Sequence, residues 1–270
     1  MSKPTPAIAF DRLYTIIARL RAPGGCPWDR EQSHASLRTH LLEETYETLD
    51  AIDRADDHDL REELGDLLMQ PLLHADIAAE EDRFDVVDVL EGISDKLVRR
   101  HPHVFGDVTV RDADEVLTNW DAIKKQEKAG RGVVETSVLD NVPAVLPSLS
   151  RALKISKKAA KVGFEWPDIE GVLEKLREET REVEYELQQG DDARLSEELG
   201  DLLFTAVNIA RWRKIDPELA LREGVARFEA RFRAMESAAA SAGLQLKSLT
   251  PDQWEDLWSA AKTETAMQKP

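Results

Sequence analysis

Residues Leu41–Leu68 read LLEETYETLDAIDRADDHDLREELGDLL and predict two helices joined by a polar turn. At about 100° per residue, the second helix gathers its leucines on one face, which predicts that this face is buried. These leucines are Leu60, Leu64, Leu67 and Leu68. The turn at Asp56–Asp59 is short, so the two helices should be antiparallel neighbours.

The same pattern occurs again at Leu176–Leu203, which reads LREETREVEYELQQGDDARLSEELGDLL. Acidic residues recur in it, each displaced by the same 135 residues. The pairs are Glu43 and Glu178, Glu44 and Glu179, Glu47 and Glu182, Glu63 and Glu198, and Asp66 and Asp201. Residues three or four apart share a helix face, so each EExxE and each ExxD presents two carboxylates in one direction. Two such helices face to face form a strained acidic cluster unless hard cations such as Mg²⁺ bind there.

The composition is that of a globular protein with a substantial core. The chain has 270 residues, 42% of them hydrophobic, and a formal net charge of −17. This charge opposes binding to nucleic acid or to an anionic membrane surface. The single cysteine, Cys26, rules out an intramolecular disulfide, and the sequence shows no signal peptide and no run of about 18 apolar residues. We therefore expect a cytoplasmic protein without nucleic-acid or membrane partners.

Glycine and proline divide the chain into two halves. Gly130, Gly132, Pro143 and Pro147 fall close together and predict a linker over residues 129–147. The expected domains are therefore an N-terminal helical domain at 1–128 and a C-terminal helical domain at 148–270. Strand signals are sparse, and the best candidate is Val108–Val110. The predicted fold class is all-α, built of tandem antiparallel helical bundles.

Further residues recur in the same order around the acidic helices. A tryptophan and an aspartate precede each acidic region, two basic residues four apart follow it, and a tryptophan with a lysine one helical turn later stands near each end. The first copy has Trp28 with Asp29, Lys96 with Arg100, and Trp120 with Lys124; the second has Trp166 with Asp168, Arg227 with Arg231, and Trp258 with Lys262. Such a set of acids, bases and aromatic rings is typical of a nucleoside polyphosphate site.

With these motifs the chain resembles the MazG family of nucleoside triphosphate pyrophosphohydrolases over nearly its whole length. The resemblance rests on CPWD at Cys26–Asp29, LEETYE at Leu42–Glu47, ELGDLL at Glu63–Leu68, RRHPHVF at Arg99–Phe105, VGFEW at Val162–Trp166 and EELGDLLF at Glu197–Phe204. It implies an all-α hydrolase, usually a homodimer, that cuts nucleoside triphosphates between the α and β phosphates. The cofactor implied is Mg²⁺, with Mn²⁺ as a substitute, and the role implied is nucleotide-pool housekeeping.

The resemblance also implies roles for individual residues. It makes Glu179, Glu182, Glu198 and Asp201 the catalytic Mg²⁺ ligands, and Glu44, Glu47, Glu63 and Asp66 the metal ligands of the first copy. It assigns nucleotide binding to Lys175, Glu178, Arg227, Arg231, Trp258 and Lys262. Which acid activates water stays open.

Family members can concentrate activity in the C-terminal domain, and Pro71 gives a physical reason to expect this here. It lies inside the first acidic helix, where the second copy has Ala206, and should kink that helix. We therefore predict the main catalytic site in the C-terminal domain and a metal-competent site in the N-terminal one.

Gly65 and Gly200 lie between the acids of the two ELGD motifs. Glycine inside a helix costs about 1 kcal/mol relative to alanine, so its presence in both copies needs a compensation. We expect close approach of another helix or of the ligand at these positions.

Other functions fit parts of the pattern. A non-enzymatic acidic helical adaptor would use the carboxylates for solubility, and we expect Glu62 and Glu197 to be solvated in any case. A di-metal carboxylate bundle of the ferritin type would pair acids with histidine at Glu-x-x-His spacing, whereas the fourth residue here is an aspartate. Asn208, on the same flank as Asp201, is expected to be a surface amide.

Overall fold

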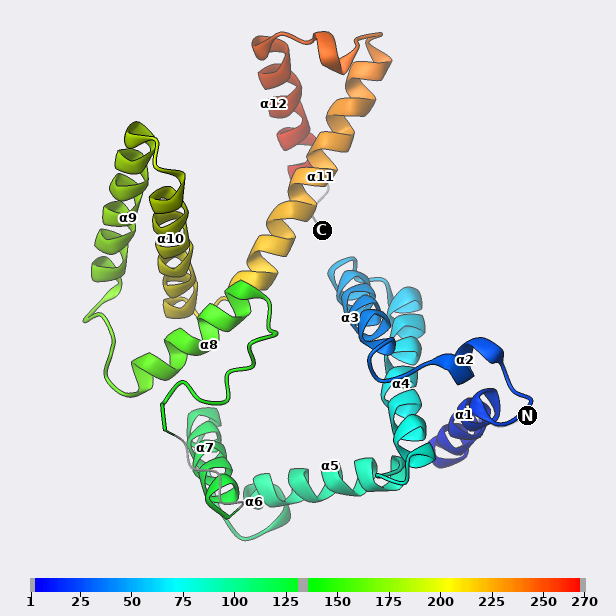
Figure 1. Ribbon diagram of the computed structural model, residues 1–270. Coiled ribbons are helices and arrows are strands. Elements are labelled where there is room, and N and C mark those ends of the chain that lie inside the picture. Colours follow the sequence, from blue (N-terminus) through cyan, green and yellow to red (C-terminus); the bar gives the residue numbers. More distant parts are fainter. Residues whose placement is uncertain (1–2, 131–135, 268–270) are drawn as a thin grey trace. The chain divides into compact units, whose positions relative to one another are not determined.

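The computed structural model describes residues 3–130 and 136–267 and is helical, with no strand in those two ranges. The all-α prediction is therefore confirmed (Figure 1). The strand candidate at Val108–Val110 is wrong, because these residues form an irregular connection between helices. The chain divides into two compact units, Met1–Val133 and Val134–Pro270.

In the first unit the acidic sequence forms an antiparallel hairpin. The helices of this unit are α1 (Pro6–Arg21), α2 (Pro27–Glu31), α3 (Leu37–Asp53), α4 (Asp57–Glu80), α5 (Val86–Arg100), α6 (Pro102–Phe105) and α7 (Ala113–Gly130). The carboxylate of Asp56 accepts hydrogen bonds from the first backbone amides of α4, which starts this helix directly after the turn. Helix α4 continues through Pro71 to Glu80, and the kink expected at Pro71 stays a prediction. Its second half forms the core with α1 through residues such as Ile17, Leu73 and Ile77.

A buried arginine fastens the segment that leads into α3. Arg21 is 5% exposed, and its guanidinium donates to the carbonyls of Asp29 and Gln32. The same group contacts two acids of α4, at 2.6 Å from Glu80 Oε2 and 3.4 Å from Asp76 Oδ2. Helix α2, which carries Trp28, and the segment after it are thereby held from α1.

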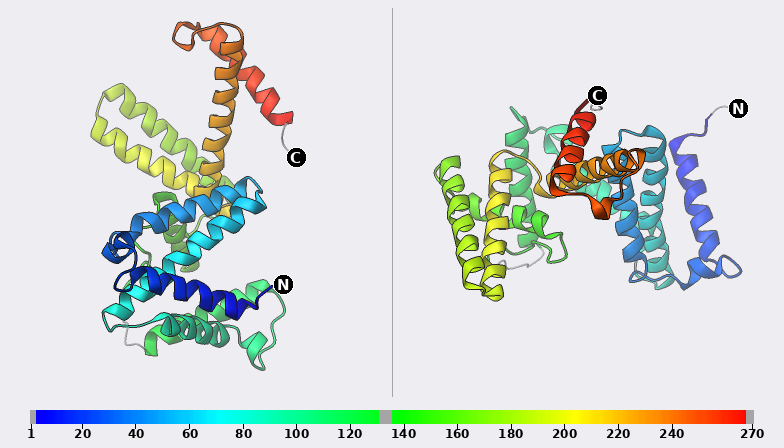
Figure 2. Two further views of the ribbon diagram at one scale, coloured as in Figure 1. Left: turned by 90° about the vertical axis from the view of Figure 1, so that its right-hand side faces the viewer. Right: turned by 90° about the horizontal axis from the view of Figure 1, so that it is seen from above.

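The second unit repeats the acidic hairpin and adds another. Its helices are α8 (Ser148–Lys161), α9 (Ile169–Gln189), α10 (Asp192–Trp212), α11 (Pro217–Ser241) and α12 (Pro251–Met267), with a 3₁₀ turn at Leu246–Ser248. Gly190 ends α9 in the left-handed conformation, at φ 72°, and Asp191 caps α10, so two residues reverse the chain. Helices α9 and α10 pack side by side, α8 packs on α10, and α11 pairs with α12 (Figure 2).

The segment between the units is only partly described. Helix α7 runs to Gly130 and α8 begins at Ser148, whereas residues 131–135 of the predicted linker lie outside the described residues. The irregular segment that is described, 136–147, is held at one end by Lys158, whose Nζ donates to the carbonyl of Asp140 at 2.6 Å. The domain limits 1–128 and 148–270 stay predictions.

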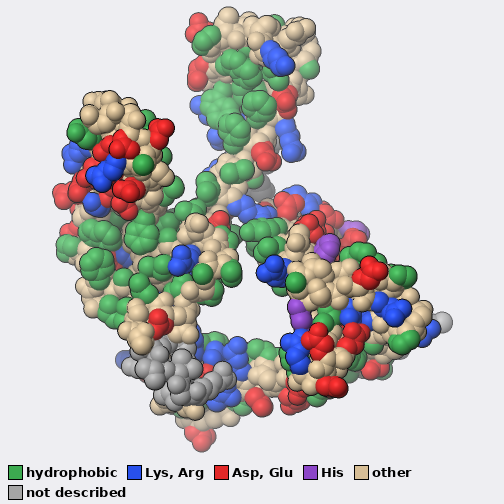
Figure 3. Space-filling model, viewed as in Figure 1, with side chains coloured by type: hydrophobic (Ala, Val, Ile, Leu, Met, Phe, Trp, Pro, Cys, Tyr) green, Lys and Arg blue, Asp and Glu red, His purple; other side chains and the backbone are tan. Residues whose placement is uncertain are grey.

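The predicted burial of the leucine faces is incomplete within one chain, where Leu60 and Leu67 are only partly buried. Leu64 and Leu68 of α4 are 49% and 43% exposed, and Leu199 of α10 is 42% exposed. The reason is geometric, because one hairpin of two helices covers only part of each helix. Hydrophobic side chains gather on the visible faces of the α9–α10 and α11–α12 hairpins (Figure 3). Across the described residues, no helix is both long and apolar enough to cross a membrane.

Candidate functional site

The second acidic hairpin brings three carboxylates together. Glu179 and Glu182 are three residues apart on α9, so they share a face, and the antiparallel α10 brings Glu198 against them. One oxygen from each of these residues lies within 4.8 Å of the others. This spacing is suited to several oxygen ligands around one cation.

Glu179 gives the strongest indication of a ligand. Its side chain is buried, at 2% exposure for the residue, and its Oε2 has no hydrogen-bond partner. A buried carboxylate oxygen without a partner is costly, and a divalent cation would satisfy it. Burial raises the pKa of Glu182, and the neighbouring Glu179 and Glu198 add to this rise. The donor set is all oxygen, which favours Mg²⁺ or Mn²⁺ over iron.

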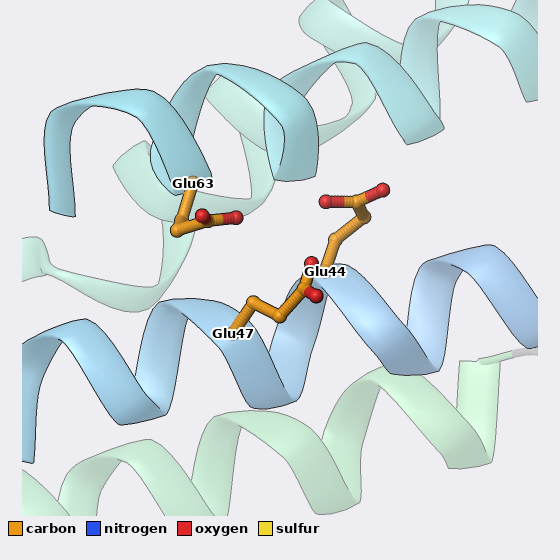
Figure 4. A group of neighbouring side chains, drawn as sticks. All are labelled: Glu44, Glu47 and Glu63. Carbon is orange, nitrogen blue, oxygen red and sulfur yellow. The ribbon is translucent and has the colours of Figure 1, made fainter. Parts of the chain in front are cut away.

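The first acidic hairpin forms the same cluster. Glu44 and Glu47 extend from α3, Glu63 extends from α4, and their carboxylates point into the space between the two helices (Figure 4). Their oxygens also lie within 4.8 Å of one another. Burial, then Asp66 and the other acids, raises the pKa of Glu44. Burial, then Glu47 and Asp66, raises the pKa of Glu63. The repeated sequence thus gives a repeated carboxylate centre.

Asp66 and Asp201 stand apart from these groups of three. Neither contributes an oxygen within the 4.8 Å limit, although Asp66 is close enough to raise the pKa of Glu44. Each aspartate follows the last glutamate by three residues and so shares its helix face. Their assignment as metal ligands stays a prediction. A Cβ added at Gly65 or Gly200 would meet no atom within 4 Å apart from the adjacent backbone of its own helix. The close approach expected there therefore does not come from the described residues of the chain itself.

A lysine distinguishes the second centre from the first. Lys175 Nζ lies 2.8 Å from Glu178 Oε1 and 2.7 Å from Glu179 Oε1, and these two acids raise the pKa of the lysine. The corresponding residue of the first copy is His40, whose ring nitrogen lies 3.1 Å from Glu43. The second centre therefore holds a permanent positive charge directly against a buried candidate ligand.

A polar cavity of about 380 Å³ opens beside the second centre. It is lined by Glu178, Glu182 and Glu198 and by four residues that the sequence analysis missed, which are Arg181, Tyr185, Glu186 and Arg194. The signal was present, because Arg194 lies four residues before Glu198 and so shares its helix face. The two arginines supply the positive charge that a polyphosphate would need near the acids.

A second cavity, apolar and of about 320 Å³, lies beside Lys175. Phe164 and Trp166 form its walls, and Lys175 lines it as well as contacting the carboxylates. Trp166 is packed on the first turn of α9, where a Cβ at Gly171 would approach the ring to 3.1 Å. Glycine at this position leaves room for the tryptophan against the helix.

The aromatic loop, residues 162–168 with Phe164 and Trp166, is anchored to α10 through a polar network that is buried at Ser156 and Asn208 and more exposed at Glu165. Glu165 receives hydrogen bonds from Arg211, with Nη2 at 2.6 Å, and from the indole of Trp212 at 3.2 Å. Arg211 Nε also donates to Asn208 Oδ1 at 3.2 Å, and Ser156 donates to the same oxygen. The expectation that Asn208 is a surface amide is wrong. It is 1% exposed because the neighbouring α8 covers this flank of α10.

We expect Arg211→Met to lower the free energy of unfolding by about 1–3 kcal/mol, because Glu165 would keep a partly buried charge without its main partner. Urea unfolding followed by circular dichroism measures this. Arg233→Met is the matched control, since Arg233 makes a 3.6 Å ion pair with Glu229 at 77% and 57% side-chain exposure. The control should cost less than about 0.5 kcal/mol. Equal losses in both variants would contradict a structural role for the network.

The remaining predicted nucleotide-binding residues form a separate group on the α11–α12 hairpin. The Arg231 guanidinium lies 5.6 Å from the Trp258 ring centre, and Lys262 Nζ lies 5.7 Å from it. Arg227 makes an exposed 3.3 Å ion pair with Glu223. Among the described residues, no recorded hydrogen bond or ion pair joins this group to Glu179, so its part in one site with the carboxylates stays a prediction.

Comparisons with known proteins agree with this geometry. A family model described as the MazG nucleotide pyrophosphohydrolase domain matches residues 32–105 and 168–234. A nucleoside triphosphate pyrophosphohydrolase of Escherichia coli (strain K12) is 48% identical over 258 residues, which are 94% of this chain and 97% of that protein. The nucleoside triphosphate pyrophosphohydrolase/pyrophosphatase MazG of Thermotoga maritima is 42% identical over 255 residues, 94% of this chain and 96% of its own length. Because the two matched segments carry the two carboxylate clusters and the relatives span nearly the whole chain, the protein belongs to the MazG nucleotide pyrophosphohydrolase family.

Proposed function

We propose that this enzyme hydrolyses nucleoside triphosphates between the α and β phosphates, with Mg²⁺ as cofactor, and releases a nucleoside monophosphate and pyrophosphate. The observation that carries the proposal is the partnerless, buried Glu179 Oε2 inside a cluster of three carboxylates. An adaptor that used its acids for solubility would expose them instead. The relatives named as nucleoside triphosphate pyrophosphohydrolases support the reaction, and nucleotide-pool housekeeping is the role that follows from it.

In this proposal the residues of the second copy bind the metal ion, the phosphates and the base. Glu179, Glu182 and Glu198, with Asp201 as a further ligand, hold Mg²⁺. The bound ion supplies charge neutralisation on the phosphates and a water of lowered pKa. Lys175 and Arg194 contact phosphate oxygens, and a carboxylate that is not fully engaged accepts the proton of the attacking water. The apolar cavity between Phe164 and Trp166 takes the base, because Lys175 links it directly to the carboxylate centre.

Incubation of the enzyme with a nucleoside triphosphate and Mg²⁺ tests the proposal. The expected products are monophosphate and pyrophosphate in equal amounts, and EDTA should abolish their formation. Release of single phosphates would contradict the position of the cut. An adaptor would show neither turnover nor metal dependence, and a di-iron bundle would respond to Fe²⁺ rather than to Mg²⁺.

We also propose that the enzyme acts as a homodimer. The support is the apolar face of α10 beside the acids, where Leu203 is 56% exposed and Leu199 is 42% exposed. A second copy packed there would bury these side chains and exclude water from the carboxylates, which strengthens their attraction for a cation. It would also offer a way to bring the basic group of an α11–α12 hairpin to a carboxylate cluster.

Leu203→Glu is expected to convert the dimer to single chains of 30.4 kDa, because a charge would have to be buried in the contact. Light scattering coupled to size-exclusion chromatography measures the mass. Val145→Glu is the control, because Val145 is 93% exposed in the segment before α8. It should leave the mass unchanged. A wild-type protein that is already a single chain would overturn the dimer proposal.

A further inference from the structure

The two units contain the same arginine–tryptophan–lysine arrangement after their acidic hairpins. In the first unit the Arg100 guanidinium lies 5.7 Å from the Trp120 ring centre, and Lys124 follows one helical turn later. In the second unit the distance from Arg231 to the Trp258 ring is 5.6 Å, and Lys262 follows at the same spacing. The cation and the ring are therefore placed alike in both copies, and differences in their surroundings can be compared directly.

The two arginines have different partners. In the first unit Glu127 receives hydrogen bonds from Arg100, with Nη2 at 2.5 Å and Nε at 3.2 Å, and from Arg99 Nε at 2.7 Å. Its side chain is only 13% exposed. Glu127 follows Trp120 by seven residues, and the residue that follows Trp258 by seven is Thr265. Among the residues that the structure describes, the only hydrogen-bond contact of Arg231 is a long one of 3.4 Å, from its Nε to the Thr265 hydroxyl, which itself donates to the Ala261 carbonyl at 2.9 Å.

The lysines show the same difference. Lys124 Nζ lies 4.0 Å from Asp121 Oδ1, three residues earlier on α7. The residue three before Lys262 is Ser259, which carries no charge. Arg99, the second donor to Glu127, corresponds to Ala230 on α11. In the first unit both cations therefore have an acid of their own, whereas the corresponding positions of the second unit carry hydroxyl groups.

We propose that Glu127 is a built-in substitute for a phosphate group, which occupies the Arg100 guanidinium and so prevents the first copy from binding a triphosphate, whereas Thr265 leaves Arg231 open to one. The inference rests on the proposed function, since it concerns phosphate recognition by the same enzyme. A carboxylate and a phosphate both take two parallel hydrogen bonds from a guanidinium, so they compete for one arginine. The first copy keeps its carboxylate cluster and therefore still binds metal ions.

This substitute stays charged throughout the working pH range. Hydrogen bonds from Arg100, then from Arg99, lower the pKa of Glu127 to about 2. Mild acidification therefore does not release the arginine, and a change of sequence is needed. Glu127 acts through Arg100, because it takes up the hydrogen bonds of that guanidinium. The decisive measurement is therefore whether removing Glu127 lets the first copy bind a ligand, since loss of a purely structural contact would not create such binding.

The experiment isolates the first copy in the full-length chain. Glu182→Gln weakens the second carboxylate centre, and calorimetry then measures binding of a non-hydrolysable α,β-methylene nucleoside triphosphate in the presence of Mn²⁺. Glu182→Gln alone should bind no analogue, and Glu182→Gln with Glu127→Thr should bind one per chain. The matched control is Glu182→Gln with Glu115→Thr. Glu115 is a carboxylate of the same helix, but it accepts a hydrogen bond of 2.9 Å from Arg111 Nε instead of one from Arg100. This control variant should bind none. Circular dichroism confirms folding of each variant.

The reciprocal change tests the second copy. Thr265→Glu in the otherwise unchanged enzyme should weaken analogue binding about tenfold to a hundredfold, with Mn²⁺ binding at both carboxylate centres retained. A folded Glu127→Thr variant that gains no analogue, or a Thr265→Glu variant of unchanged affinity, would overturn the inference while leaving the proposed function intact. A wild-type enzyme that binds no analogue would overturn both.

Discussion

Glu198→Gln is expected to lower pyrophosphate release by about a hundredfold or more, whereas Glu63→Gln should leave most of it. The substitution replaces a charged cation ligand with a neutral amide of the same shape in a cluster whose members lie within 4.8 Å of one another. Glu63 belongs to the equivalent cluster of the first copy, where Glu127 occupies the arginine that phosphate would need. Loss of the same side chain should therefore have unequal effects in the two copies.

Initial rates with a nucleoside triphosphate at saturating Mg²⁺, measured for both variants beside the wild type, give the comparison. Glu197→Gln is the control, because Glu197 is not one of the three clustered carboxylates and its side chain is 68% exposed. It should retain most of the activity. If Glu63→Gln abolished turnover and Glu198→Gln did not, the assignment of the main catalytic site to the second copy would be wrong.

Lys175→Met is expected to have opposite effects on the two ligands of the enzyme. The lysine lies 2.7 Å from Glu179 Oε1 and so competes with a cation for this oxygen. Its removal should tighten binding of Mn²⁺ alone by about tenfold, because a like charge leaves the site. Binding of the triphosphate should weaken by about tenfold to a hundredfold, since one phosphate contact is lost. A residue that only stabilised α9 would not separate the two affinities in this way.

Electron paramagnetic resonance of free Mn²⁺ measures the first affinity, and calorimetry with the methylene analogue at saturating Mn²⁺ measures the second. Lys154→Met is the matched control, because Lys154 is an exposed lysine of α8. It should change neither value. Weaker metal binding in Lys175→Met would show that the lysine supports the ion rather than competing with it.

The local pattern of the sequence was enough to predict the acidic hairpins and their carboxylates. Helical spacing places Glu179 and Glu182 on one face, and a two-residue turn after α9 leaves α10 antiparallel, so Glu198 has to come opposite. These relations extend over fewer than thirty residues and depend only on helix geometry. The all-α fold was predictable for the same reason.

Relations between distant segments were not predictable in this way. The burial of Asn208 depends on α8, which reaches it from 52 residues earlier in the chain. The exposure of Leu64 was missed because an apolar face predicts that something covers it without saying whether the cover belongs to the same chain. The pairing of Arg100 with Glu127 joins two helices whose relative rotation is not visible in the periodicity of either.

The segments that precede the two acidic helices are held by different helices. Arg21 of α1 bonds backbone carbonyls at α2 and directly after it, whereas Arg211 of α10 bonds the side chain of Glu165 in the aromatic loop. The two halves therefore repeat the same acidic hairpin, but the segments before these hairpins cannot be exchanged between the halves. In a hybrid chain, a segment moved from one half to the other would lack the arginine that holds it. Recombination between the halves therefore has to move each segment together with the helix that carries its arginine.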